Sequence, residues 1–482
     1  MAGQTAIYGL SSMVGRFINY LLVFVHTRVL IPEQFGVMTG MYSYVSFLII
    51  VFTYGMETAF FRFATKTGYD REKVFSTSLI SLICSSVILF LLIAFFSPSI
   101  AGATGYGAYP QYITWFALIL AADAITAIPF VNLRLEGKAT RFVLFKLINI
   151  FLVVGFNLFF LVLCPYLLKH NVKFVEAIYH PGFGVGYVFL SNLIASVVTF
   201  LLLLPDILRA KFAFSSVLWK EMIYYALPLL PAGLAGMINE TLDRILLIRM
   251  LPSHEALYQT GIYGANYKLA MLMTLFIQTF RYAAEPFFFA ESLKTDAKKT
   301  YADVMKYFVI VCTFIFLGVT LYLDIVKGFI GKAYHPGLGV VPVLLLANLC
   351  LGIYINLSIW FKLTGQTRFG LYITILGAAI TILLNYMWIP VYGYVGSAWA
   401  TLICYFVMML VCYFLGERYY TIPYNIPRIL FYLALALVIY FANLGIRHMY
   451  AGTATVIALN SCLVLAYLSI IYYLERPKKI VP

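Results

Sequence analysis

The chain has 482 residues, of which 63% are hydrophobic and 11% are charged, and its formal net charge is +14. A soluble globular protein is about 45–50% apolar and about 25% charged, so this composition excludes a water-soluble chain and indicates a protein that lies largely within a lipid bilayer. The polar stretches between the apolar segments are too short to form soluble domains.

Fourteen apolar segments are long enough to cross a bilayer, because a span needs about 20 mainly apolar residues. The start of the chain lacks the basic region of a cleaved signal peptide, so we expect the first span to be retained. In chain order, the span centres are predicted near residues 17, 48, 85, 120, 153, 195, 235, 270, 313, 350, 378, 404, 435 and 463.

Lysine and arginine are distributed unevenly between the two sides of these spans. With a cytoplasmic N-terminus, 23 of the 33 lie at cytoplasmic ends and loops, 7 lie outside, and Arg16, Arg244 and Lys268 remain at membrane depth. Cytoplasmic loops carry an excess of Lys and Arg, so the bias predicts that both termini are cytoplasmic. The positive charge then lies beside anionic lipid, and no nucleic-acid partner is expected.

The sequence contains no recognisable catalytic or metal-binding pattern. The seven cysteines all lie in apolar segments without C-x-x-C spacing, which predicts buried free thiols. The six histidines are not part of an H-E-x-x-H motif or a pattern typical of a catalytic triad, and no P-loop is present. We therefore expect a membrane carrier and not an enzyme, with no catalytic residues, metal site or cofactor.

The seventh span carries Pro228 and Pro231 near its start. Proline removes a backbone donor and clashes with the preceding turn, so this helix is predicted to kink. Such a helix can bend during alternating access, and a static kink is the alternative.

The chain resembles itself at a separation near 220 residues. Spans one to six correspond to spans seven to twelve, and since six is an even number the repeat is predicted to be parallel, with a substrate path between the halves. We expect an N-terminal six-helix lobe at 1–210, a C-terminal six-helix lobe at 211–416, and two accessory helices with a basic cytoplasmic tail at 417–482. The matching segments are Arg28–Pro32 with Arg249–Pro252, Leu135–Phe142 with Leu363–Phe369, Asn157 with Asn385, and Gly184–Gly186 with Tyr394–Gly396.

From about residue 5 to residue 415, the chain resembles the oligosaccharide-lipid flippases, or polysaccharide exporters, of the multidrug/oligosaccharidyl-lipid/polysaccharide exporter superfamily. Each motif is weak alone, and the resemblance rests on their order and spacing. The motifs are Arg28–Gly36, Gly55–Arg62, Leu227–Arg244, Gly261–Lys268, Gly331–Tyr334 and Asn385–Gly396.

This resemblance implies a flippase of the bacterial inner membrane that exports a polyprenyl-pyrophosphate-linked oligosaccharide by alternating access. The product would serve surface polysaccharide biosynthesis, as lipopolysaccharide O-antigen, capsule or exopolysaccharide. It also implies that glycosyltransferases and a polysaccharide polymerase work beside the flippase.

Three cations at membrane depth are the candidate substrate-binding residues. A charge at mid-bilayer costs about 2.5–3.5 kcal/mol on insertion scales, so Arg16, Lys268 and Arg244 are expected to face a cavity or a partner. Arginine suits bidentate contact with the pyrophosphate that the resemblance implies. The alternative is a structural ion pair, with Asp123 or Asp243 for Arg16, and with Glu240 one helical turn earlier for Arg244.

Three acids are the candidate ion-coupling residues. Asp123 in span four and Glu240 and Asp243 in span seven can bind H⁺ or Na⁺ if they lie in the wet interior of the carrier. Neutralisation by a nearby base is the alternative. Asp243 is expected to point about 100° away from Arg244 and to meet another helix.

Two other functions stay open at this point. A drug/cation antiporter of the same superfamily predicts twelve spans and an acidic cavity, and a membrane glycan polymerase or ligase predicts a large outer loop with catalytic residues. A peptidoglycan-precursor flippase is a close relative of the favoured function. The glycan, the coupling ion and the oligomeric state are not determined by these residues.

Overall fold

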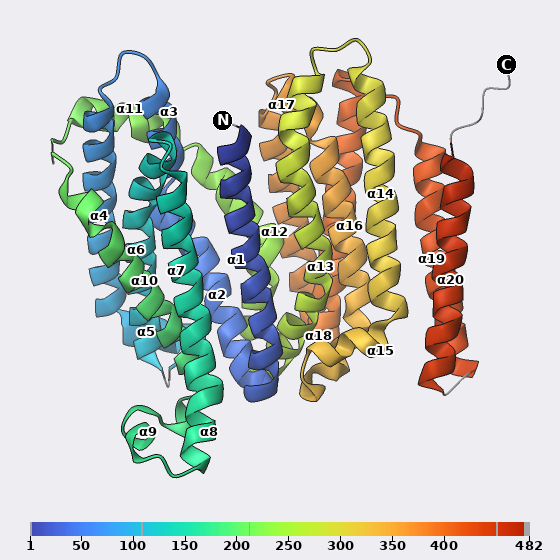
Figure 1. The fold of residues 1–482 in the computed structure, drawn as a ribbon, viewed down its shortest axis with the longest axis horizontal. Helices are drawn as coiled ribbons and strands as arrows, with labels where there is room; N and C mark the ends of the chain where they lie inside the picture. The colour runs from blue at the N-terminus through green and yellow to red at the C-terminus, as the bar shows by residue number, and fades with distance from the viewer. Residues whose placement is uncertain (1, 108, 212, 450–451, 477–482) are drawn as a thin grey trace. The chain divides into compact units, whose positions relative to one another are not determined.

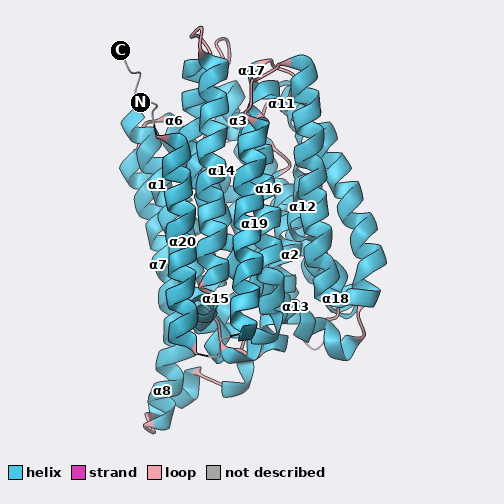
Figure 2. Cartoon of the chain, turned by 90° about the vertical axis from the view of Figure 1, so that its right-hand side faces the viewer, coloured by secondary structure: helices cyan, strands magenta, loops and turns pink. Residues whose placement is uncertain are grey.

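The computed structural model describes residues 2–107, 109–211, 213–449 and 452–476, and within these it gives no side-chain placement for residues 2–13, Arg16 and Thr453. The described residues form helices joined by short loops, without a strand (Figure 2). The chain divides into a first unit, Met1–Ala265 with Ala378–Ser397, and a second unit, Asn266–Gly377 with Ala398–Pro482. The expected lobe boundaries at residues 210 and 416 stay a prediction.

The first unit is built around long helices that pack side by side, α4 on α6, α6 on α10 and α10 on α7 (Figure 1). Short helices α8 and α9 extend beyond the end of α7. Its helices are α1 (Ala2–Val29), α2 (Pro32–Thr53), α3 (Met56–Thr65), α4 (Arg71–Phe95), α5 (Ser97–Thr104), α6 (Pro110–Leu135), α7 (Ala139–Leu158), the π-helix η1 (Phe159–Leu163), α8 (Cys164–Lys169), α9 (Lys173–Ile178), the 3₁₀-helix η2 (Pro181–Phe183), α10 (Gly186–Leu208), α11 (Ser216–Ala226) and α12 (Leu229–Met250).

Two long helices contribute to both units, α13 (Ser253–Glu291) and α18 (Arg368–Tyr419). The remaining helices of the second unit are α14 (Ala297–Leu321), α15 (Leu323–Val326), the 3₁₀-helices η3 (Lys327–Phe329) and η4 (Lys332–Val340), α16 (Val341–Leu357), α17 (Ile359–Leu363), α19 (Ile426–Met449) and α20 (Thr453–Glu475).

Eleven helices of the described residues are long and apolar enough to span a membrane, which confirms an all-α multi-pass membrane fold. The fourteen predicted spans exceed this number for identifiable reasons. Residues 368–419 count once although Gly393, with φ 55° and ψ −137°, interrupts the helix, and α1 offers only Phe17–Val29 as a shorter apolar helix. The 39-residue helix α13 is not among the eleven.

The predicted break in the seventh span is confirmed. Helix α11 ends at Ala226 and α12 begins at Leu229, with Pro228 between them. Proline is tolerated at this position because the first helical N–H groups have no partner inside the helix. The prediction of buried thiols is correct for five cysteines and wrong for Cys84 and Cys462, which lie on exposed faces of α4 and α20.

The segments predicted to repeat have equivalent conformations. Gly137 and Gly365 have φ values of 69° and 70°, and each lies in the turn shortly before a helix of the matching pair. Gly184 has a φ value of 47°, and Gly393, one residue before the predicted matching segment Tyr394–Gly396, has a φ value of 55°. A β-carbon on either of these would overlap a glutamine side chain, that of Gln34 at Gly184 and that of Gln259 at Gly393.

The paired asparagines share a hydrogen-bonding pattern as well as a position. Asn157 donates to the Val153 carbonyl at 2.7 Å, and Asn385 donates to the Thr381 carbonyl at 2.8 Å. Each side-chain oxygen also contacts a polar residue of another segment, His26 or Ser397. Both asparagines are fully buried.

Helices α19 and α20 are joined to the second unit by polar contacts. Asn443 donates to Asn460 at 2.7 Å, and Asn460 donates to the Leu321 carbonyl at the end of α14 at 2.6 Å. Near the other end of α20, Glu475 pairs with Lys306 of α14 at 2.8 Å and with Arg428 of α19 at 2.9 Å. Hydrogen bonds and ion pairs in apolar surroundings therefore hold α19 and α20 at both ends of α20.

Candidate functional site

A polar cavity of about 520 Å³ lies inside the first unit. It is lined by α2, α3, α6, α7 and α10, which bring together residues separated by more than 150 positions in the chain. The lining side chains are Tyr42, Val45, Ile49, Thr53, Glu57, Phe116, Ile119, Asp123, Thr126, Ala127, Phe130, Arg134, Phe142, Lys146, Asn149, Asn192, Ser196 and Thr199.

Asp123 of α6 and Lys146 of α7 face each other across this cavity. Their side chains interact electrostatically, and Asp123 also interacts with Ser196 of α10. Both residues are exposed although each lies within a candidate span, so their exposed surface is the surface of the cavity. The Lys146 ammonium group also lies 4.0 Å from the centre of the Phe130 ring, a cation–π contact.

An ion pair lies toward the end of the cavity. Arg134, in the last turn of α6, donates to the Glu57 carboxylate of α3 at 3.0 Å. Arg134 is 11 residues from Asp123, which is about 16 Å along a helix. The cavity thus extends from the end of α6 to the middle of that helix.

Neutral polar groups line the opposite wall. Asn149 of α7 donates to Thr199 of α10 at 2.9 Å, and Asn192 of α10 donates to the Tyr42 hydroxyl of α2. Asn192 also donates to the Val188 carbonyl at 3.0 Å, and Thr199 donates to the Ala195 carbonyl at 2.7 Å. The second N–H of Asn149 and the side-chain oxygens of Asn149 and Asn192 are then available to water or a ligand.

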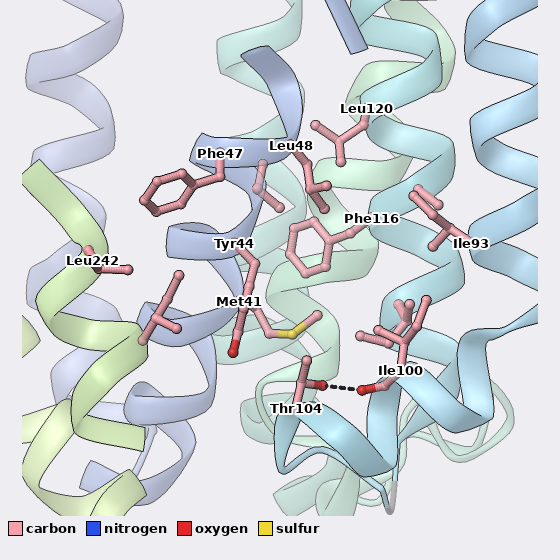
Figure 3. Close-up of a pocket in the computed structure, with 14 residues that line it drawn as sticks. Met41, Tyr44, Phe47, Leu48, Ile93, Ile100, Thr104, Phe116, Leu120 and Leu242 are labelled. Atoms are coloured by element: carbon pink, nitrogen blue, oxygen red, sulfur yellow. Dashed lines mark hydrogen bonds between the residues drawn. The ribbon is translucent and has the colours of Figure 1, made fainter. Parts of the chain in front are cut away.

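An apolar pocket of about 460 Å³ adjoins the polar cavity, and the two share Val45 and Phe116 (Figure 3). Helices α2, α4, α5, α6 and α12 supply its walls. The Thr104 hydroxyl, one of its few polar groups, donates to the Ile100 carbonyl at 2.7 Å. The lining has no charged side chain and so offers no counter-charge to a phosphate.

Two of the three charges predicted in span seven, Asp243 and Arg244, form a buried pair in the first unit. Arg244 pairs with the Asp243 carboxylate at 3.1 Å and donates to the Glu240 backbone carbonyl. Asp243 also accepts a hydrogen bond of 2.6 Å from Tyr263 of α13. Asp243 therefore meets another helix, as expected, but the expectation that it points away from Arg244 was wrong, because the long arginine side chain folds back along α12.

The other predicted site residues lie in different places. Lys268 is half-buried on the part of α13 that belongs to the second unit, and Glu240 is exposed on α12. Arg16 lies on α1, and its side chain is outside the described part of the structure. The role assigned to each of these residues stays a prediction.

Lys146 and Arg134 were missed as site residues because their positions near span ends led us to count them with the cytoplasmic charges. The spacing of polar residues along the helices could have identified them. The cavity-facing residues recur every three or four positions, which places them on one helix face. They are Asp123, Ala127, Phe130 and Arg134 on α6, then Phe142, Lys146 and Asn149 on α7, then Asn192, Ser196 and Thr199 on α10.

Comparison with known families gives a match over residues 2–290 to the family described as polysaccharide biosynthesis protein. The chain belongs to this family. It is a family of membrane transporters and flippases, not of enzymes.

Among curated proteins, an uncharacterized membrane protein of Methanocaldococcus jannaschii is 21% identical over 417 residues, which cover 83% of this chain and 94% of the relative. Among solved structures, the lipid II flippase MurJ in an inward closed conformation matches with a TM-score of 0.72 at 14% identity, over 97% of this chain and 99% of MurJ.

Two further structures come from the MOP superfamily. An inward-facing multidrug resistance MATE transporter gives a TM-score of 0.65 at 17% identity, over 83% of this chain and 93% of that transporter. A MOP superfamily transporter from Pyrococcus furiosus, with a binding pocket of reversed polarity, gives a TM-score of 0.59 at 17% identity, over 86% and 95% of the two chains. The fold is therefore that of MurJ and the MATE transporters.

Proposed function

We propose that this protein is a flippase that moves a polyprenyl-pyrophosphate-linked oligosaccharide across the inner membrane for surface polysaccharide synthesis. Membership of the polysaccharide biosynthesis protein family carries the proposal. The fold of the lipid II flippase MurJ along nearly the whole chain supports it, since lipid II is itself a lipid-linked sugar. Glycosyltransferases that build the precursor and a polymerase that consumes it are the partners that this function requires.

The proposed architecture has fourteen spans with both termini in the cytoplasm, as two parallel six-helix lobes, 1–210 and 211–416, and an accessory pair at 417–482. The interruption of α18 at Gly393 supports two spans in that helix, and α1 and α13 supply two more. The matching glycine conformations of the two halves support the parallel repeat. Labelling by a membrane-impermeant thiol reagent tests the orientation. Thr67→Cys should react only from the cytoplasm and Asn171→Cys only from outside.

In this proposal Arg16, Lys268 and Arg244 bind the pyrophosphate, and Asp123, Glu240 and Asp243 couple transport to H⁺ or Na⁺. Arg244 already pairs with Asp243, so a phosphate would have to replace that carboxylate. Such an exchange would link substrate binding at Arg244 to release of Asp243 for a cation.

The decisive experiment measures accumulation of the lipid-linked precursor in the inner leaflet of a strain that lacks this protein. Wild-type protein should restore surface glycan and clear the precursor. Arg16→Ala should abolish export while the protein still inserts, and Arg16→Lys should be partly active because a point charge loses the bidentate contact. Normal export without the protein contradicts the function, and full export by both Arg16→Ala and Lys268→Ala removes these residues from the mechanism.

A peptidoglycan-precursor flippase is the second candidate, and the match to MurJ over 97% of the chain favours it. Expression of this protein in cells depleted of their own lipid II flippase separates the two candidates. Rescue of growth supports the second candidate, and rescue of a surface-glycan defect alone supports the first.

A further inference from the structure

We propose that the polar cavity of the first unit is a binding site for neutral sugar units of the transported molecule, and not for its pyrophosphate. This inference rests on the proposed function and names the part of the substrate that this cavity receives. The argument depends on the charge of the cavity, on its hydrogen-bonding groups and on its size.

Charge excludes the pyrophosphate from this cavity. Its lining contains two acids, Glu57 and Asp123, and two bases, Arg134 and Lys146, so the formal charge of the wall is zero. Arg134 is already paired with Glu57 at 3.0 Å, and Lys146 interacts electrostatically with Asp123. A pyrophosphate would therefore meet no net positive charge on this wall, and at Arg134 it would also have to displace the Glu57 carboxylate.

The groups on the wall match the chemistry of a sugar. Hydroxyl groups of a sugar both donate and accept hydrogen bonds. Asn149 uses one of its two N–H groups on Thr199, so it can donate the other and accept at its oxygen. The side-chain oxygens of Asn192, Thr126 and Thr199, whose N–H or O–H groups bond within the protein, can accept. A sugar hydroxyl can donate a charge-assisted hydrogen bond to the Glu57 or Asp123 carboxylate, and it can accept one from the Arg134 guanidinium or the Lys146 ammonium group.

Aromatic rings provide the second feature that a sugar needs. A pyranose ring has hydroxyl groups around its edge and C–H groups on its faces, and the C–H faces pack on aromatic rings. Tyr42, Phe116, Phe130 and Phe142 all line the cavity. The centroids of the Phe130 and Phe142 rings lie 5.4 Å apart in an edge-to-face arrangement. Lys146 and Arg134 each lie over one of these rings, so the remaining faces and edges supply the apolar contacts beside the polar groups.

The size of the cavity is also suitable. Its volume of about 520 Å³ lies within the range of small-molecule sites. A hexose ring occupies roughly 180 Å³, so the cavity has room for about two sugar units with some water, and not for a long oligosaccharide. The remaining sugars and the lipid of the substrate must lie elsewhere.

Protection of a cavity cysteine from labelling tests this assignment. The full-length protein in lipid nanodiscs carries Ala127→Cys, which lines the cavity without a polar role, or Thr67→Cys, which is exposed on the loop between α3 and α4. Three probes are compared: the neutral glycan released from the cell's lipid-linked precursor by mild acid, a panel of neutral disaccharides, and inorganic pyrophosphate. Labelling by a water-soluble maleimide is quantified at each site by mass spectrometry, which separates it from the native cysteines.

The released glycan, at about ten times its Kd, should slow labelling of Ala127→Cys about tenfold, because only about one site in eleven is then free. Labelling of Thr67→Cys should not change. Asn149→Leu or Asn192→Leu, added to Ala127→Cys, should raise the Kd about tenfold, while Asn192→Gln should retain part of the affinity. An equal melting temperature for all variants establishes that folding is not the cause.

Protection by pyrophosphate but not by the glycan, or by no probe at all, overturns the sugar assignment. The proposed function fails by a different result, which is normal surface glycan and no precursor accumulation in cells without the protein. If that result occurs while neutral disaccharides still protect Ala127→Cys, the cavity is a sugar site of a carrier with another substrate.

Discussion

Gly36 of α2 and Gly261 of α13 lie where the two helices cross in direct backbone contact. A β-carbon on Gly36 would overlap the Leu257 carbonyl oxygen of α13, and one on Gly261 would overlap the Pro32 carbonyl oxygen of α2. The relationship is reciprocal, so each helix presents its glycine to a carbonyl of the other. Only glycine permits this distance between two helix backbones in a membrane protein.

Gly36→Ala and Gly261→Ala should therefore destabilise the protein, by about 1–3 kcal/mol, because the two backbones must move apart. Gly236→Ala on α12 is the matched control, since a β-carbon there meets no atom within 4 Å. The control should be neutral or stabilising, because alanine is favoured over glycine within helices. Thermal unfolding of the purified protein, monitored by size-exclusion chromatography after heating, measures the difference in stability. Equal melting temperatures for Gly36→Ala and Gly236→Ala would contradict the close crossing.

The Asp123–Lys146 pair should behave as a coupled unit. Lys146→Met leaves the Asp123 charge without its partner, and Asp123→Asn leaves the Lys146 charge alone, so each single change should destabilise the protein. The double variant should recover about 1 kcal/mol of the summed loss, less than for a dry buried pair because the cavity exposes both groups. A double-mutant cycle on melting temperature measures this coupling. Additive effects would show that the two groups do not interact.

Asp324, which lies outside the candidate membrane spans, should make the stability of the protein depend on pH. A hydrogen bond of 2.8 Å from Lys327 lowers the pKa of its carboxyl, and Arg447 of α19, at 3.0 Å, acts in the same direction. Because the pKa is lower in the folded than in the unfolded protein, the stabilisation is complete above the ordinary value of about 4. It is lost as the pH falls through the lowered folded value.

The melting temperature of Asp324→Asn should therefore lie below that of the wild type by a constant amount between about pH 5 and pH 7. The difference should begin to shrink below about pH 4, where the unfolded carboxyl takes up a proton, and should be lost once the pH is below the lowered pKa of the folded carboxyl. Thermal unfolding at a series of pH values checks this. A difference that does not shrink at all as the pH falls below about 4 would mean that Asp324 does not act through its charge.

Asn460 should be essential for the docking of α20. Asn460→Leu removes the acceptor for the buried Asn443 amide and one of two donors to the Leu321 carbonyl, to which Arg447 also donates at 3.2 Å. The lost hydrogen bonds should cost about 1–3 kcal/mol. Ser469→Leu, on an exposed face of the same helix, is the control and should have little effect. Thermal unfolding of the two variants in the same detergent makes the comparison. Similar melting temperatures for Asn460→Leu and Ser469→Leu would mean that the Asn460 contacts contribute little to the stability of the protein.

The sequence predicted the features that depend on local chemistry. Hydropathy located most of the membrane helices, and Pro228 marked a helix break. The repeated glycines were predicted only as matching positions, and their positive φ values came from the structure. The sequence did not predict the cavity, since five helices from Tyr42 to Thr199 build it and hydropathy does not reveal which faces meet. For the same reason, Lys146 could not be distinguished from an orienting charge.

The contacts of α20 with α14 have a consequence for biosynthesis. The Leu321 carbonyl receives hydrogen bonds from Arg447 and Asn460, which follow it by 126 and 139 residues. At about 5–20 residues per second, the ribosome needs about 7 to 28 s to synthesise the chain from Leu321 to Asn460. Until both donors have been made, the end of α14 is in the membrane without its full set of partners, which is the period in which a chaperone or insertase would have to protect it.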